Sequence, residues 1–391
     1  MSAQSRVVRR ISAALLSFSL ICLVGVGDGP VAVAADAPDV FIVANVHVDE
    51  SAAAVADART TALARGERRA FDELMRRLTV RSDRDRLPRP GAETIAGLVQ
   101  DISIANEKSS RVRYIADVTY RFKPQAIRAL MRNNGLRYAE TRSKPVLVLP
   151  LYETAGTMAL WEDPNPWRKV WAGAPERTGL VPLLSPASDL RDIAEISAEL
   201  AASGDVPRLR AIAQRYGADA AIVARAAVET RPNGRPEVAV TAVTYGAADR
   251  DQTVVTTLVA IANENLDALL ERARRDISDL IEEHWKSANL IQFEQNSVMV
   301  AEMPLASLRE WVEAQKRFRE VALIQRVDLV LMSREEARFN LFYLGDASQL
   351  KLALAQKDLV LTEGQGSWTL SFSARAAQSK GGPPGASKGG P

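Results

Sequence analysis

Residue types that usually perform catalysis are few in this chain and poorly spaced for it. Its two histidines, His47 and His284, fall in different predicted modules, and neither has a partner at a zinc-ligand spacing such as H-x-x-x-H. Ser348 and Lys351 match the S-x-x-K motif of penicillin-interacting enzymes, but no S-D-N or K-T-G motif follows them. We therefore expect no catalytic residue, no bound metal and no cofactor.

Paired carboxylates are the remaining candidates for general acid–base chemistry. Glu162 is next to Asp163, and Asp83 and Asp85 lie two residues apart. The chain has 48 acidic residues in all, so such pairs arise easily, and carboxylates in loops are usually solvated. A carboxylate-dependent hydrolase is thus an alternative, and a non-enzymatic protein is our prediction.

Three tryptophans are a candidate for binding. Trp161, Trp167 and Trp171 fall within eleven residues of an irregular segment that also contains two prolines. Indole rings exposed on a surface could stack on sugars or anchor a protein partner. Alternatively, the three rings hold a long loop to its own domain.

A basic loop is the second candidate for binding. Between positions 76 and 89 the chain carries six arginines, which are opposed by only two aspartates. We single out Arg81, Arg84 and Arg86 as residues that could contact lipid head groups or acidic partner proteins. The alternative is a solvated helix end.

The hydrophobic pattern predicts three small modules, of which the first covers residues 39–140. Alternating apolar residues in 40–48 predict a half-buried strand with His47 on its outer face. The residues of this strand that we expect to face the core are Val40, Ile42, Ala44, Val46 and Val48. The later predicted elements are helices at 52–78, 92–99 and 124–133 and strands at 102–107 and 111–122.

The second module, residues 144–290, is predicted to be an α/β or α+β sandwich. It opens with the apolar strand 146–149, which could instead close the first module. An irregular segment, 152–186, follows this strand. The later predicted elements are helices at 189–202, 207–216 and 263–286 and strands at 220–228, 238–245 and 252–261.

The third module, residues 296–373, has the order β-α-β-β-α-β plus one hairpin strand, which predicts a ferredoxin-like fold. Its first helix is expected to direct Leu305, Leu308, Trp311 and Val312 towards the core. Strand 336–344 carries aromatic side chains on both faces, so either face could meet the helices. Residues 374–391 are rich in Gly, Pro, Ser, Lys and Ala, and we expect a disordered tail.

Residues 1–34 have the features of a secretory signal peptide. Three arginines precede an apolar stretch, and an A-x-A site ends at Ala34. An uncleaved anchor, a twin-arginine signal and a lipoprotein cysteine at Cys22 are less favoured alternatives. Cleavage would remove the only cysteine and place the mature protein in the periplasm, without disulfides or a membrane-spanning segment.

The charge balance of the mature chain excludes one class of partner. Of 50 basic and 48 acidic residues, the leader removes three and one, which leaves 50 − 3 = 47 basic and 48 − 1 = 47 acidic residues. A nearly neutral chain lacks the field that attracts nucleic acid, so we expect no nucleic-acid partner.

The combined pattern resembles a family of exported bacterial proteins described as domain of unknown function number 2066. The resemblance rests on the strand 40–48 and its helix, on the strand 114–122, on the string 307–311, on 343–346 and on Trp368. The family has no assigned activity, so the resemblance implies export but no site. The passage from a helix through Gly217 to a strand is also similar to small α/β domains of periplasmic assembly proteins.

These features predict a non-enzymatic periplasmic adaptor or envelope-assembly factor that binds a protein partner. Sheet edges are the surfaces on which a partner strand could add. A protein that binds peptidoglycan or another part of the cell wall is the first alternative, and the hydrolase is the second.

Overall fold

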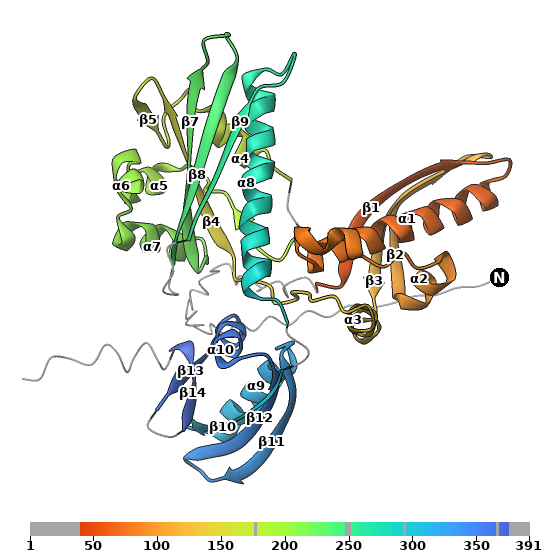
Figure 1. Ribbon diagram of the computed structural model, residues 1–391, viewed down its shortest axis with the longest axis vertical. Coiled ribbons are helices and arrows are strands. Elements are labelled where there is room, and N and C mark those ends of the chain that lie inside the picture. The colour runs from red at the N-terminus through yellow and green to blue at the C-terminus, as the bar shows by residue number, and fades with distance from the viewer. Residues whose placement is uncertain (1–39, 176–177, 247–251, 292–294, 365–366, 375–391) are drawn as a thin grey trace, which may run out of the picture. The chain divides into compact units, whose positions relative to one another are not determined.

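The computed structural model describes residues 40–175, 178–246, 252–291, 295–364 and 367–374. These residues form a mixed α+β structure with three β-sheets and 11 helices (Figure 1). None of the described helices combines the length and the apolar character needed to cross a bilayer. The predicted signal peptide at 1–34 and all but the first residue of the predicted tail lie outside the described residues.

The first module is built on a three-stranded antiparallel sheet. Its elements are β1 (Ile42–Ser51), α1 (Val55–Leu78), the 3₁₀ helix η1 (Arg81–Arg86), α2 (Ala92–Leu98), β2 (Val99–Ser109), β3 (Arg113–Phe122) and α3 (Pro124–Asn133). The strands have the order β1-β3-β2, and α1 packs along one face of the sheet (Figure 1). Phe71 of α1 meets Phe122 of β3 in the core between them.

The predicted inner face of β1 is wrong in its first half. Phe41, Val43 and Val48 are buried, whereas Ile42 and Ala44 are only partly buried. The pairing of β1 with β3 shifts register between Val43 and Val46, and such a bulge moves the following side chains to the opposite face. A strictly alternating pattern cannot describe a strand that contains this shift.

The second module is one sheet with helices on both faces. Its elements are β4 (Val146–Thr154), β5 (Thr157–Ala159), α4 (Pro166–Ala172), β6 (Leu183–Leu184), α5 (Leu190–Glu195), α6 (Ala198–Ser203), α7 (Val206–Arg215), β7 (Ala220–Thr230), β8 (Pro236–Gly246), β9 (Gln252–Val259) and α8 (Leu266–Ala288). The main strand order is β5-β4-β7-β8-β9, with β6 paired to β4. The strand at 146–149 therefore belongs to this sheet and does not close the first.

Two apolar cores lie on opposite faces of the second sheet. Helices α4 and α8 cover one face, and α6 and α7 cover the other (Figure 1). The single helix predicted over 189–202 is in fact α5 and α6, because Ser197 caps a new helix through a bond from the Leu200 amide. The segment predicted to be irregular, 152–186, contains α4.

The third module follows the predicted order of elements. They are β10 (Asn296–Pro304), α9 (Leu308–Arg319), β11 (Ile324–Met332), β12 (Glu336–Leu344), α10 (Ala347–Ala355), β13 (Leu359–Glu363) and β14 (Trp368–Phe372). The strand order is β11-β12-β10-β14-β13, so the hairpin strand β14 lies between β13 and β10 and runs parallel to β10. The face of β12 that packs in the core carries Phe339, Leu341 and Tyr343.

The predicted inner face of α9 is partly wrong. Trp311, Ala314 and Phe318 form its buried stripe, whereas Leu308 and Val312 are 64% and 58% exposed. Each helical residue turns about 100° from the last, so a stripe centred on Trp311 leaves Leu308 and Val312 on the flank.

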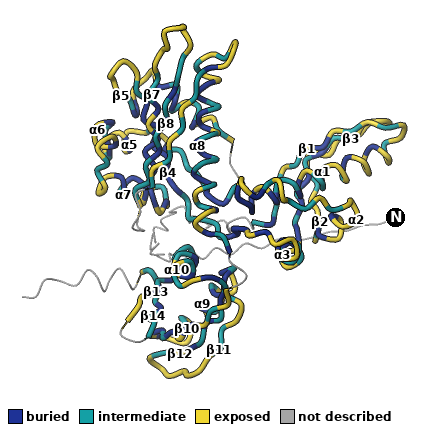
Figure 2. The backbone as a smooth tube through the Cα atoms, in the orientation of Figure 1, coloured by how far each residue is buried: buried dark blue, intermediate teal, exposed yellow. Residues whose placement is uncertain are grey.

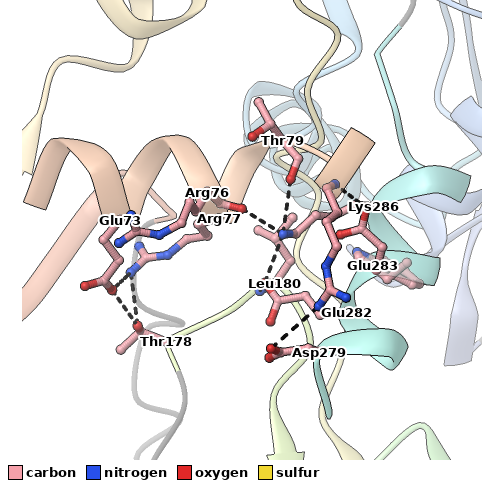
Figure 3. A network of polar contacts seen from close by, with 12 residues as sticks. Glu73, Arg76, Arg77, Thr79, Thr178, Leu180, Asp279, Glu282, Glu283 and Lys286 are labelled. Carbon is pink, nitrogen blue, oxygen red and sulfur yellow. Dashed lines mark hydrogen bonds and ion pairs between the residues drawn. The ribbon is translucent and has the colours of Figure 1, made fainter. Parts of the chain in front are cut away.

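A polar network joins the end of α1 to the end of α8 (Figure 3). The buried ammonium group of Lys286 donates to the carbonyl oxygens of Arg76 at 2.8 Å and Thr79 at 3.3 Å, and lies 3.7 Å from a carboxylate oxygen of Glu282. These carbonyls end α1, where no intrahelical donor remains for them. A lysine of the second module thus caps a helix of the first.

Candidate functional site

The three tryptophans lie in the core of the second module. Trp167 is fully buried and its Nε1 donates to the Ala224 carbonyl at 2.8 Å, while Trp171 packs edge-on against it. Trp161 is buried on the opposite face of the sheet, with its Nε1 on the Ile196 carbonyl at 2.7 Å. The first alternative, an exposed binding surface, is therefore wrong, and the second holds: the three rings anchor α4 and its flanking loop to their own module.

The three arginines lie in η1 beside the junction with α8. Arg81 bonds to Glu283 through its amide and lies 3.9 Å from Asp279 through its guanidinium group (Figure 3). Arg86 lies 3.8 Å from Asp83, and Arg84 is half-buried. Part of the charge that suggested a lipid or protein surface is therefore opposed by carboxylates of the same chain.

The candidate catalytic side chains have structural partners. His47 is exposed on the outer face, as predicted, and its Nδ1 lies 2.8 Å from Asp117. Hydrogen bonds from Asn106 and His47 hold the pKa of Asp117 below its usual value. The described residues contain no cluster of potential metal ligands.

The carboxylates of Glu162 and Asp163 and the lysine of the S-x-x-K match also have partners within the chain. Glu162 accepts the backbone amides of its own turn, and Asp163 pairs with Arg168 at 2.9 Å. Lys351 lies over the ring of Trp368, 5.2 Å from its centre. These contacts account for the side chains without a reaction.

A run of exposed apolar residues lies at the outer strand of the third sheet. Strand β11 pairs with β12 on one side only. Its last four residues are all exposed and all apolar: Leu329, Val330, Leu331 and Met332 (Figure 2). Such a run on a sheet edge usually marks a place where another chain binds or where the protein aggregates.

Helix α9 forms a second wall beside this strand. Gln315 and Arg319 of α9 line a hollow with residues 324–327 of β11, and its volume is about 230 Å³. Leu308 and Val312 are on the same flank of the helix as Gln315 and Arg319, because the four positions are spaced by three or four residues. We call the surface formed by this flank of α9 and the outer edge of β11 the β11–α9 groove, with an apolar end at Leu308, Val312 and 329–332 and a polar end at the hollow. Leu329 and Met332 pair with Phe339 and Ala337 and so lie on the α9 side of the sheet, whereas Leu331 pairs with Arg338 and faces the other side.

The backbone of β11 is regular over a short stretch. Its register with β12 shifts between Ile324 and Arg326 and again between Leu329 and Leu331. Bulges of this kind blunt a sheet edge. A partner strand could therefore pair regularly along 326–329 only, so the apolar side chains must supply much of the contact.

The outer edge of the first sheet provides an internal comparison. There, β1 also lies beside a long helix, but arginines of α1 occupy its outward carbonyls. Arg69 donates to His47 at 2.8 Å, and Arg77 donates to Val40 at 2.8 Å and Ile42 at 2.7 Å. No such bond from the described part of the chain reaches the backbone of 326–329. The β1 edge is capped, and the β11 edge is open.

The sequence contains a signal for this groove that the order of predicted elements does not reveal. Strand β11 ends in four consecutive apolar residues, whereas a strand with one solvated face should alternate. The exposed edge strand β9 has no such run within its bounds, because Thr256 and Thr257 separate its apolar pairs 254–255 and 258–259. An unbroken apolar run on the edge strand of a sheet indicates an interface.

No protein-family model matches the chain, and no curated protein matches it. The resemblance to family 2066 therefore stays a prediction.

Proposed function

We propose that this protein is a non-enzymatic adaptor or assembly factor of the bacterial cell envelope, and that it binds a segment of a protein partner in the β11–α9 groove. The observation that carries this proposal is the open β11 edge, which ends in four exposed apolar residues, together with the exposed Leu308 and Val312 of α9. The site requires no cofactor.

The groove offers enough apolar surface to hold a partner. Val330 and Leu331 are 61% and 48% exposed, and Leu308 and Val312 are exposed to a similar degree. Full burial of one such side chain contributes roughly 1.5–3 kcal/mol. Covering the exposed parts of six of them gives several kcal/mol before the entropic cost of association.

The proposal also includes export of the chain, membership of family 2066 and a ferredoxin-like third module. A cleaved leader at 1–34 would bring the chain to the periplasm, as in the proteins of family 2066. The order of β10, α9, β11, β12, α10 and β13 supports a ferredoxin-like class for the third module. Strand β14 departs from that class, since it separates β13 from β10.

Cell-wall binding has less support, because sugar-binding surfaces need exposed aromatic rings. The open face of β12 carries Phe342, but the guanidinium group of Arg326 lies 4.1 Å from the centre of its ring. The three tryptophans are buried.

Photo-crosslinking in cells tests the proposal. A photoreactive amino acid placed at Val330 should crosslink to one or two discrete envelope proteins. The matched control is Val255, which is 58% exposed on the edge strand β9 of the second sheet. Val330→Asp should abolish the interaction measured with the captured partner, whereas Val255→Asp should leave it unchanged.

The proposal fails under either of two results. One is that crosslinks from Val330 and Val255 have the same partners and yield. The other is that Val330→Asp, shown to fold by its circular dichroism spectrum and melting temperature, binds the partner as tightly as the natural chain.

A further inference from the structure

The polar end of the groove has the composition of a carboxylate receptor. Arg319, Arg326, Gln315 and Gln325 contribute to the walls of the hollow, and no acidic side chain lines it. Guanidinium and amide groups supply N–H donors, and a guanidinium group can grip a carboxylate with two parallel bonds.

One of the two guanidinium groups is available to a ligand. Arg326 pairs with Asp328 at 3.0 Å and is held over Phe342. Arg319 is exposed and has no ion pair or hydrogen bond within the part of the chain that the structure describes. Two other cations of the third module are paired: Arg317 with Glu313, and Lys357 with Glu320.

From this arrangement we infer that the partner segment is extended, apolar at one end, and carries an aspartate or glutamate that binds Arg319 in the hollow. This inference rests on the proposed function, since it specifies what the β11–α9 groove recognises. The hollow begins at residue 324 and the exposed apolar run ends at residue 332. At about 3.3 Å per residue, a segment of about six to eight residues spans that distance.

A second copy of this chain fits the groove less well. Two β11 strands related by a two-fold axis would pair antiparallel, which places the polar end of one groove against the apolar end of the other. Arg319 would then lie near Leu308 of the copy, and a cation would lose water without gaining a partner. A partner with its own carboxylate avoids that cost.

Defined peptides test the charge preference. The probes are labelled nine-residue peptides with valine and threonine alternating, and with Glu, Gln or Lys at one end, each made in both chain directions. Fluorescence anisotropy with the purified mature protein measures their affinities. For one direction, the Glu peptide should bind about fivefold more tightly than the Gln peptide, with the Lys peptide weaker still.

Charge reversal at Arg319 is the decisive variant. Arg319→Glu should make the Lys peptide the preferred one, and raised salt should weaken the preference of the natural chain. The control is Arg210→Glu on α7, an exposed arginine far along the sequence, which changes net charge equally. That control should leave the order Glu, Gln, Lys unchanged.

The possible failures are distinguishable. If all three peptides bind equally and Val330→Asp abolishes their binding, the groove is a partner site but the acidic preference is refuted. If no peptide binds and crosslinking at Val330 also fails, both the acidic preference and the proposed function are refuted. If sedimentation shows a dimer that Val330→Asp dissociates, a second copy occupies the groove and the inference is overturned.

Discussion

Replacing Lys286 by methionine should destabilise the junction between α1 and α8 by about 3 kcal/mol. Methionine keeps most of the buried stem but removes the ammonium group. The carbonyls of Arg76 and Thr79 then lose their donor, at about 1–3 kcal/mol for each group left unpaired. Glu282 loses one of its partners, and breaking a buried pair costs up to about 3–5 kcal/mol. Relief of the desolvation of the ammonium group offsets part of this sum.

Native-state hydrogen exchange of the amides at the end of α1 measures this effect. A chain of several modules need not unfold in two states, so a local opening free energy is better defined than a global one. The control is Lys316→Met on α9, where the lysine is exposed, and we expect a change within about 0.5 kcal/mol. Adding Glu282→Gln to Lys286→Met should recover about 1–2 kcal/mol, because the buried carboxylate that lost the Lys286 ammonium group is then replaced by a neutral amide.

A pH series gives the same reasoning a second test. Burial lowers the pKa of Lys286 below its usual 10.5, so the unfolded chain binds this proton more tightly than the folded chain does. Stability from this group therefore rises with pH through the window just below 10.5. The difference between the natural chain and Lys286→Met should widen there. A loss under about 0.5 kcal/mol that does not vary with pH would refute the reasoning.

Two further predictions concern single positions. Gly66→Ala should destabilise the first module by roughly 1–3 kcal/mol in urea unfolding, since the new Cβ would clash with the Tyr120 hydroxyl. Gly97→Ala on α2, with no neighbour within 4 Å, should be neutral or stabilising. In the natural chain, the hydrogen bond from Arg215 lowers the pKa of Asp189 to about 2. Asp189→Asn keeps the cap of α5 but removes this carboxylate partner of Arg215. The stabilisation by this pair is present above the ordinary pKa of 3.8 and is lost as pH falls towards 2. The difference in urea midpoint between this variant and the natural chain should therefore shrink to nothing over that range. A difference that stays constant would contradict the prediction.

Elements with strong local signals could be predicted from the sequence. Helix α3 begins at Pro124, a residue favoured at the start of a helix, and ends before Gly135 at the predicted residue. Strand β12 also has its predicted bounds, 336–344, because the turn around Ser333 limits its start. These signals lie within a few residues of the element that they delimit.

Features that depend on tertiary contacts could not be predicted in this way. The bulge in β1 arises from pairing with β3, and the only local sign of it in 43–46 is Asn45, which adopts a positive φ of 56°. The tryptophans are buried because they pack in the two cores of the second module, and the indole N–H groups of Trp167 and Trp161 donate to carbonyls of Ala224 and Ile196, which are 57 and 35 residues away. The candidate site was missed for the same reason, since Leu308 and Val312 have the spacing of core residues and only the position of Trp311 turns them outward.

The contrast between the two edges shows how side-chain choice on a helix decides which edge a partner can use. On α1, Arg65, Arg69 and Arg77 recur at multiples of four residues, so they form one row along the β1 edge. Their long side chains donate to Glu50 and to the outward carbonyls of β1. On α9, the corresponding flank carries Leu308 and Val312, which cannot donate a hydrogen bond and cannot satisfy a strand edge. The first sheet thus closes its β1 edge, whereas the third leaves the β11 edge open, which is where we propose that a chain with both a strand and a carboxylate binds.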